Sequence, residues 1–231
     1  MKFSRWRFFL PLLVVLVSPV VAEPLPIKVV VVSMFEIGED TGDTAGEFQR
    51  WVERGNFTNK LDFPLGLHNI YHRDDGVMVI CTAGGVTNAT ATIMALGQDA
   101  RFDLSKAYWV IAGIAGADPQ DCSLGSAAWA KWVVDGDLAY EIDGREIPED
   151  WEYGFIALGA EEPNTLDNGW TVETIAYVLH SDLVDWAFAQ TKDMELPDHP
   201  EMAEFRTQFL PDFPNAAKPP FVLIGDSLGS S

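Results

Sequence analysis

The stretch that most constrains the fold of this chain runs from Cys81 to Asp137. Its residues predict, in order, the end of a strand, a Gly-Gly turn, a helix, a buried strand, a second turn of small residues and a longer strand that leads away. A strand, a helix and another strand in that order are typical of an open α/β sheet. Ligands of such sheets bind where strands end and turns begin, so these two turns mark the predicted site.

The composition is that of one globular domain. Of the 231 residues, 48% are hydrophobic and 12% aromatic, which is enough to bury one sizeable core. The net charge of −20 repels phosphate backbones, so we do not expect a nucleic-acid partner. The two cysteines and four histidines show no metal-ligand spacing. We therefore expect neither a metal nor a cofactor.

The first 22 residues have the pattern of a secretory signal peptide. Lys2, Arg5 and Arg7 precede an apolar run, and Ala22 closes a small-residue cleavage motif. An uncleaved membrane anchor is the alternative, although a membrane span needs roughly 20 apolar residues and this run is shorter. The pattern predicts a secreted or periplasmic protein whose mature domain is 23–231 and does not remain inserted in a membrane.

Two interpretations remain open for the cysteines. In an oxidising compartment Cys81 and Cys122 could form a disulfide. Cys81, however, lies in the apolar run VMVICTAGG and could equally be a plain buried thiol.

An unalternating run of β-branched residues at 27–35 predicts a central parallel strand that is buried on both faces. The loop that follows interleaves glycines with carboxylates, and Asp43 or Thr44 could cap the next helix. This loop could be a solvated turn. Alternatively, Glu36 at the end of the strand points into the site as an acid, a base or a hydrogen-bond acceptor. A calcium site is a further alternative, but the spacing is not that of an EF-hand.

The remaining chain alternates predicted strands with predicted helices. Pattern and turn signals place two strands joined by a His-Arg-Asp-Asp-Gly turn (67–71 and 76–82), then a helix (87–99) and a buried parallel strand (107–113). A short strand (155–158), two helices (171–192 and 201–210) and a last strand (221–224) follow.

Four segments, in this order, carry a resemblance to a known family: KVVVVSMFEIGED, TAGGVTNATATIMALGQD, WVIAGIAGADPQDCSLGSAAWAKWVVDGD and VLIGDSLGSS. The chain resembles the nucleoside phosphorylase superfamily, and within it is most similar to the purine nucleoside permeases. The resemblance covers nearly all of the predicted mature chain. It implies an α/β fold of three layers, a sandwich around a mostly parallel or mixed central sheet.

The resemblance also implies a ligand and a site. A purine nucleoside would be held with its ribose between the first loop and the small-residue turns. Carried over position by position, Glu36 is the implied catalytic residue. The implied ligand-binding residues are Thr82, Gly84, Gly85, Asn88, Gly113, Ile114, Ala115, Gly116, Asp226 and Ser227.

The function implied by the resemblance is purine nucleoside binding or uptake. Phosphorolysis in the superfamily needs an arginine before the second turn, where this chain has Val110 and Ile111. The hydrolases take their acid from an Asp beyond the GDS turn, so we expect this chain to be truncated on its C-terminal side. The alternative is an extracytoplasmic purine nucleosidase or phosphorylase that cleaves the N-glycosidic bond. Association of copies into a homo-oligomer is left open.

The GDS turn at Gly225-Asp226-Ser227 has a second interpretation. Esterases of the GDSL type use such a serine as nucleophile, but near their amino end and with a later Asp and His. Here the turn comes near the last residue, Ser231, which disfavours an esterase. In the nucleoside phosphorylases, by resemblance, the turn lines the ribose or phosphate side of the site.

Overall fold

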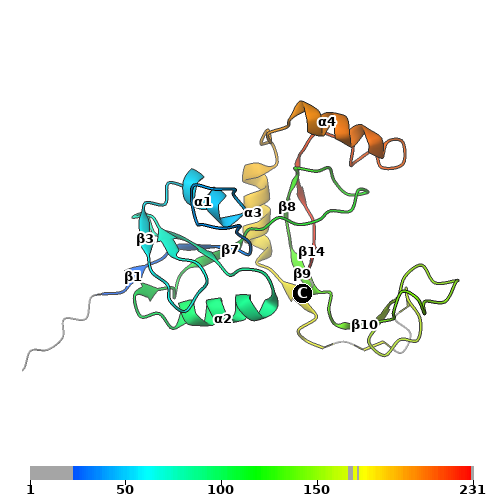
Figure 1. The fold of residues 1–231 in the computed structure, drawn as a ribbon, viewed down its shortest axis with the longest axis horizontal. Helices are drawn as coiled ribbons and strands as arrows, with labels where there is room; N and C mark the ends of the chain where they lie inside the picture. Colours follow the sequence, from blue (N-terminus) through cyan, green and yellow to red (C-terminus); the bar gives the residue numbers. More distant parts are fainter. Residues whose placement is uncertain (1–22, 166–168, 171, 230–231) are drawn as a thin grey trace, which may run out of the picture. The chain divides into compact units, whose positions relative to one another are not determined.

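The structure is a computed structural model that describes residues 23–165, 169–170 and 172–229, so the predicted leader lies outside the described residues. The protein is a mixed α/β chain with several sheets (Figure 1). It divides into two compact units, which meet in sequence between Gly113 and Ile114.

The first unit is built around a five-stranded mixed sheet. Its strand order is β3 (Asn59–Leu61), β4 (Ile70–His72), β5 (Val77–Cys81), β2 (Val29–Ser33) and β7 (Tyr108–Ile111). β2, β5 and β7 run parallel, whereas β3–β4 and β4–β5 are antiparallel pairs. Two shorter strands, β1 (Leu25–Pro26) and β6 (Phe102–Asp103), pair parallel with each other.

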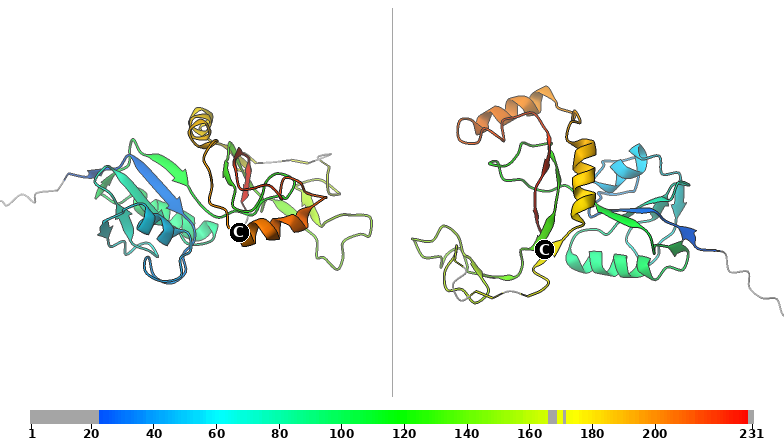
Figure 2. Two further views of the ribbon diagram at one scale, coloured as in Figure 1. Left: turned by 90° about the horizontal axis from the view of Figure 1, so that it is seen from above. Right: turned by 180° about the vertical axis from the view of Figure 1, so that it is seen from behind.

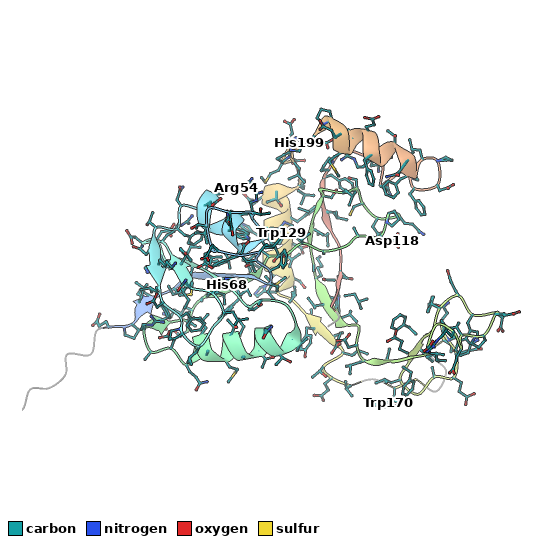
Figure 3. All side chains as sticks on the ribbon, in the orientation of Figure 1. Arg54, His68, Asp118, Trp129, Trp170 and His199 are labelled. Atoms are coloured by element: carbon teal, nitrogen blue, oxygen red, sulfur yellow. The ribbon has the colours of Figure 1, made fainter. Side chains whose placement is uncertain are left out.

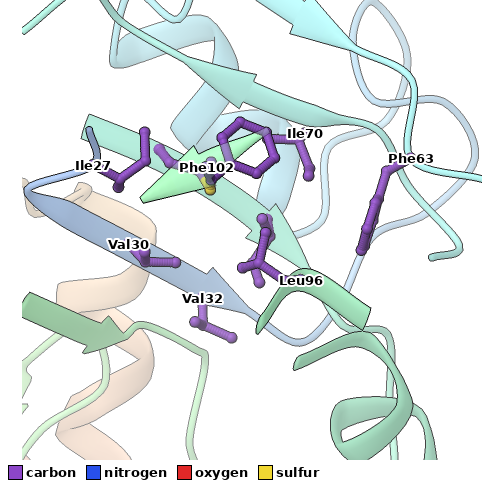
Figure 4. Close-up of a cluster of buried hydrophobic side chains, with 9 residues drawn as sticks. Ile27, Val30, Val32, Phe63, Ile70, Leu96 and Phe102 are labelled. Atoms are coloured by element: carbon purple, nitrogen blue, oxygen red, sulfur yellow. The ribbon is translucent and has the colours of Figure 1, made fainter. Parts of the chain in front are cut away.

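Two helices, α1 (Phe48–Arg54) and α2 (Val86–Gly97), cover opposite faces of this sheet (Figure 2). Successive side chains of a strand point to opposite faces. Val30 and Val32 of β2 therefore pack with Leu96 of α2, and Val31 packs with Phe48 of α1. This double burial explains why the strand is β-branched without alternation. Figure 4 shows the cluster on the α2 side, formed by Ile27, Val30, Val32, Phe63, Ile70, Met78, Ile80, Leu96 and Phe102.

Several sequence predictions are confirmed in this unit. β2 lies within the predicted strand 27–35 and is central, and α2 matches the predicted helix 87–99 closely. β4 and β5 form the predicted hairpin. β4 begins three residues later than predicted, because His68 and Asn69 instead contact Asp40 from the preceding loop.

Two predictions for the first unit are wrong. The strand at 107–113 is parallel as predicted, but it is not buried: β7 is the sheet's edge, and Tyr108 and Ile111 are 60% and 69% exposed. Apolarity alone does not distinguish an edge strand from a central one. Neither Asp43 nor Thr44 caps α1. The helix begins after Glu47, and the carboxylate of Glu36 accepts from the Gln49 backbone N–H instead.

The second unit contains several short strands and the helix α3 (Ser181–Thr191). β8 (Ala127–Trp129) pairs parallel with β13 (Val222–Ile224), and α3 contacts both strands. β9 (Trp132–Asp135) lies between β12 (Ala176–Val178) and β14 (Ser227–Gly229). β10 (Ala139–Glu141) and β11 (Phe155–Ala157) form an antiparallel pair. α4 (Pro200–Arg206) continues into a 3-10 helix, η1 (Thr207–Phe209).

The predicted helix 171–192 is only half correct. Its second half is α3, but Ala176–Val178 is strand β12, paired antiparallel with β9. The helix starts where the His180 ring accepts a hydrogen bond from the Leu183 backbone N–H, which makes His180 the cap. Tertiary pairing with β9 has overridden the helical spacing of the preceding residues.

Among the described residues, both cysteines are free thiols, and Cys81 is buried as the second interpretation predicted. No helix in the described part of the chain has the length and apolarity that crossing a bilayer requires.

Candidate functional site at the strand ends

The candidate site lies where the parallel strands β2, β5 and β7 of the first unit end. The carboxyl ends of parallel strands meet at one edge, and three connections leave the sheet there. Residues 34–47 follow β2, 82–85 follow β5, and 112–113 follow β7. Backbone hydrogen bonds join the second and third connections to the end of β2: the Thr82 N–H donates to the Ser33 carbonyl at 2.9 Å, and the Ala112 N–H to the Val32 carbonyl at 2.8 Å.

Glu36 organises the first of these connections. Its carboxylate accepts hydrogen bonds from the backbone N–H groups of Ile37 at 2.8 Å, Gly46 at 2.6 Å and Gln49. The bond to Gln49 also satisfies a free N–H in the first turn of α1. Glu36 thus closes the loop onto the start of the helix, and a catalytic role for it remains a prediction.

Glu47 is a second carboxylate at this edge, which the sequence interpretation missed. Its Oε2 accepts from the Met34 backbone N–H at 3.0 Å. Its Oε1 lies 3.2 Å from the position that a Cβ on Gly113 would occupy, so the side chain reaches from the end of β2 toward the end of β7. The only sequence signal was an acidic residue at the start of a helix that follows the first loop.

The second connection is the predicted Gly-Gly turn. Thr82 is buried, and its hydroxyl is within hydrogen-bonding distance of the Ala83 carbonyl at 3.0 Å, so it supports the backbone of the turn. The Asn88 side-chain amide donates to the Gly84 carbonyl at 2.7 Å. Gly84 and Gly85 are exposed, so backbone is what this turn presents to a ligand. Backbone N–H groups at the start of α2 suit an oxygen atom of such a ligand.

Gly85 should be sensitive to substitution because its backbone has φ +90° and ψ 147°, a region that side-chain-bearing residues rarely adopt. We expect Gly85→Ala to lower the free energy of unfolding by about 1–3 kcal/mol. No atom lies within 4 Å of a Cβ added at Gly84 or at Gly85. Gly84→Ala is therefore a matched control, because it adds the same methyl group without the unfavourable backbone conformation of Gly85. Urea denaturation followed by circular dichroism measures both. Equal losses in the two variants would contradict the expectation.

The other predicted site residues belong to the second unit. Ile114, Ala115 and Gly116 are exposed in its first segment. Asp226 accepts from the Trp132 backbone N–H at 3.0 Å, between β13 and β14, and Ser227 begins β14. The GDS turn therefore connects two consecutive parallel pairings, β8–β13 and β9–β14. A single site that combines these residues with those of the first unit stays a prediction.

A buried polar network lies beside the first connection. The Asp40 carboxylate is 2.8 Å from Nδ1 of His68 and accepts from the Asn69 amide at 3.0 Å and the Tyr71 hydroxyl at 3.1 Å. Burial raises the pKa of Asp40, but these three hydrogen bonds outweigh it and leave the pKa below its ordinary value of 3.8. Figure 3 labels His68 among the side chains of the first unit.

The groups at this edge are hydrogen-bonding groups. Carboxylate oxygens accept hydrogen bonds from hydroxyl groups, and the exposed turn offers backbone groups. The described residues at the three strand ends, 34–36, 82–85 and 112–113, include no basic side chain that would hold a phosphate. The fold and this edge define the class: an α/β protein with a candidate site for a small polar molecule.

Comparison with known proteins gives the family. The profile of the purine nucleoside permease family matches residues 26–231, and the chain belongs to that family. A probable purine nucleoside permease of Schizosaccharomyces pombe is 28% identical over 214 residues, which cover 87% of this chain. A purine nucleoside permease of Candida albicans is 30% identical over 146 residues, or 60% of this chain.

The matched regions are only part of those relatives. They cover 58% of the length of the S. pombe protein and 34% of the C. albicans protein. No solved structure matches the chain significantly.

Proposed function

We propose that this protein binds a purine nucleoside and serves its uptake from outside the cytoplasm. The observation that carries the proposal is the family match over residues 26–231, together with relatives that are named purine nucleoside permeases. The leader-like first 22 residues support a secreted or periplasmic location. In that location the protein would capture the nucleoside and hand it on.

The strand ends of the first unit support the ligand class. A nucleoside carries hydroxyl donors on its ribose and no phosphate. Two carboxylates, Glu36 and Glu47, lie at or beside this edge, and the described strand ends have no basic residue. Glu47 is the better placed to accept from a ribose hydroxyl, because its Oε1 reaches to 3.2 Å from the position of a Cβ on Gly113, at the end of β7.

The finer architecture is also part of the proposal. The first unit has a mixed sheet with a helix on each face, as one half of a three-layer sandwich of the nucleoside phosphorylase type would have.

Isothermal titration calorimetry with adenosine and inosine, combined with chromatography for released base, tests the function. We expect saturable binding of at least one nucleoside without release of free base. Glu47→Gln should weaken binding about tenfold or more, because a carboxylate accepts a hydroxyl hydrogen bond more strongly than an amide does. The exposed Glu39 provides the matched control, and Glu39→Gln should bind normally.

The outcomes separate the alternatives. Release of free base at a rate proportional to protein concentration would support the nucleosidase interpretation. Absence of heat with both nucleosides at millimolar concentration would contradict binding. Equal weakening in Glu47→Gln and Glu39→Gln would remove Glu47 from the site.

A further inference from the structure

Residues 34–47, the loop that follows β2, are tied to the sheet at one buried point. Between Glu36 and Ala45, Asp40 is the only buried residue, and its neighbours from Ile37 to Thr44 are exposed. Its carboxylate contacts three side chains from β4 and the residues just before it: His68, Asn69 and Tyr71. Asp40 therefore holds this mostly solvated loop to the sheet, while α1 holds it from the helix side: the Gly42 N–H donates to Glu53 at 3.0 Å, and the Gln49 amide donates to the Asp43 carbonyl at 3.2 Å.

Two glycines give the loop the bends that bring Asp40 inward. Gly38 has φ +77° and Gly42 has φ +87°, and they lie two residues before and after Asp40. A Cβ on Gly38 would lie 2.2 Å from a carboxylate oxygen of Asp43, so the turn is also tightly packed there. The turns at the two glycines and the hydrogen bonds of Asp40 thus both hold the Asp40 carboxylate against the sheet.

His68 is the partner whose charge can change near neutral pH. The groups that face it are the Asp40 carboxylate from the loop, the Cys81 sulfur from β5 and the Phe48 ring of α1, with ring centroids 5.7 Å apart. Tyr71 and Asn69 share the Asp40 carboxylate. Lys60 of β3 lies over the Tyr71 ring, 5.6 Å from its centroid. Both charged side chains of the Asp40–His68 pair are largely buried, at 8% and 16% exposure.

We propose that Asp40 and His68 form a latch that keeps loop 34–47 closed over the strand ends when His68 is protonated, and that deprotonation of His68 loosens the loop. Because Glu36 and Glu47 belong to this loop, the latch positions both carboxylates. The consequence for nucleoside binding rests on the proposed function. The latch itself does not.

The direction of the pH dependence follows from the contacts. Contact with the Cys81 sulfur and the Asp40 carboxylate raises the pKa of His68 from 6.5 to about 9, against the opposing effect of burial. The closed loop holds this proton more tightly than the open loop. The stabilisation by His68 is therefore complete below pH 6.5 and is lost progressively as the pH rises through about 9. Asp40, with its lowered pKa, stabilises the closed loop above about pH 4.

Hydrogen exchange of the full chain between pH 6.5 and 8.5 tests the latch without any ligand. The measured exchange rates are corrected for the intrinsic rates of unstructured peptides of the same sequence. The equilibrium constant for opening of residues 36–46 should then rise about tenfold per pH unit. His68→Gln should abolish this rise and leave the loop open throughout. His199, an exposed residue of the second unit, supplies the control: His199→Gln should retain the rise.

Two further variants keep the result interpretable. Cys81→Ser should retain the pH-dependent rise, since Asp40 remains; loss of the rise would make the sulfur, not Asp40, the partner and overturn the proposal. Asp40→Asn should remove the rise. An unchanged rise in His68→Gln would likewise overturn it.

Nucleoside binding measured over the same pH range separates the two proposals. If the opening of the loop depends on pH but the protein binds no nucleoside, the result supports the latch and contradicts the proposed function. Nucleoside affinity that falls with the loop opening, and becomes independent of pH in His68→Gln, supports both. Binding with a loop whose opening does not depend on pH contradicts the latch alone.

Discussion

Replacing Phe48 by alanine is expected to lower the free energy of unfolding of the first unit by about 3–5 kcal/mol. Phe48 begins α1 and is completely buried. Its ring packs against those of His68 and Tyr71, with centroids 5.7 and 5.8 Å away. Removing the ring leaves a cavity between α1 and the sheet and takes away one wall of the Asp40 network. Urea denaturation followed by circular dichroism is the measurement.

Trp51 on the same helix is the matched control for Phe48. Its side chain is 38% exposed, so Trp51→Ala removes an aromatic residue of greater size with less loss of packing. We expect a smaller loss than for Phe48→Ala, because part of the Trp51 side chain already contacts water in the folded state. If Trp51→Ala were as damaging as Phe48→Ala, the assignment of the buried face of α1 would be wrong.

Leu96→Ala is expected to lower the free energy of unfolding of the first unit by about 2–5 kcal/mol. Leu96 lies on the face of the sheet opposite to Phe48. Leu96 is completely buried in the cluster that joins α2 to Val30, Met78 and Ile80. Its loss leaves a cavity that the surrounding β-branched side chains cannot fill, because their rotamers are restricted. The same urea denaturation measures the effect.

Met94 tests whether burial, rather than the helix itself, sets the cost at Leu96. Met94 lies two residues earlier on α2 and is 58% exposed. Alanine at this position removes a long apolar side chain from the solvated face, where the expected change is within about 0.5 kcal/mol. A cost at Met94 near that at Leu96 would mean that another surface covers the outer face of α2.

The predictions made from sequence succeeded where local pattern decides structure. The unalternating run of valines predicted a strand buried on both faces, and β2 packs against helices on each. The Asp-Asp-Gly turn predicted the β4–β5 hairpin, and the Gly-Gly turn predicted the start of α2. Each of these features depends on residues close together in the sequence.

The predictions failed where distant residues decide. Ala176–Val178 has helical spacing with α3 but pairs with β9, more than 40 residues earlier in the chain. The apolar strand β7 was expected to be buried because nothing in its own residues marks an edge. The hydrogen bonds that Glu36 accepts from its own loop and from the start of α1 could also not be predicted from its sequence neighbours, and its role toward a ligand stays a prediction.

By itself, the sequence determined the family and the order of strands and helices around the first small-residue turn, and it predicted the edge of the sheet at which a site is proposed. These follow from hydrophobic period and turn chemistry, which act over a few residues. Only the tertiary structure decided that Glu47 reaches toward Gly113 and that Asp40 binds His68, 28 positions away. A carboxylate's role depends on which donors surround it after folding, and its neighbours in sequence do not specify those donors.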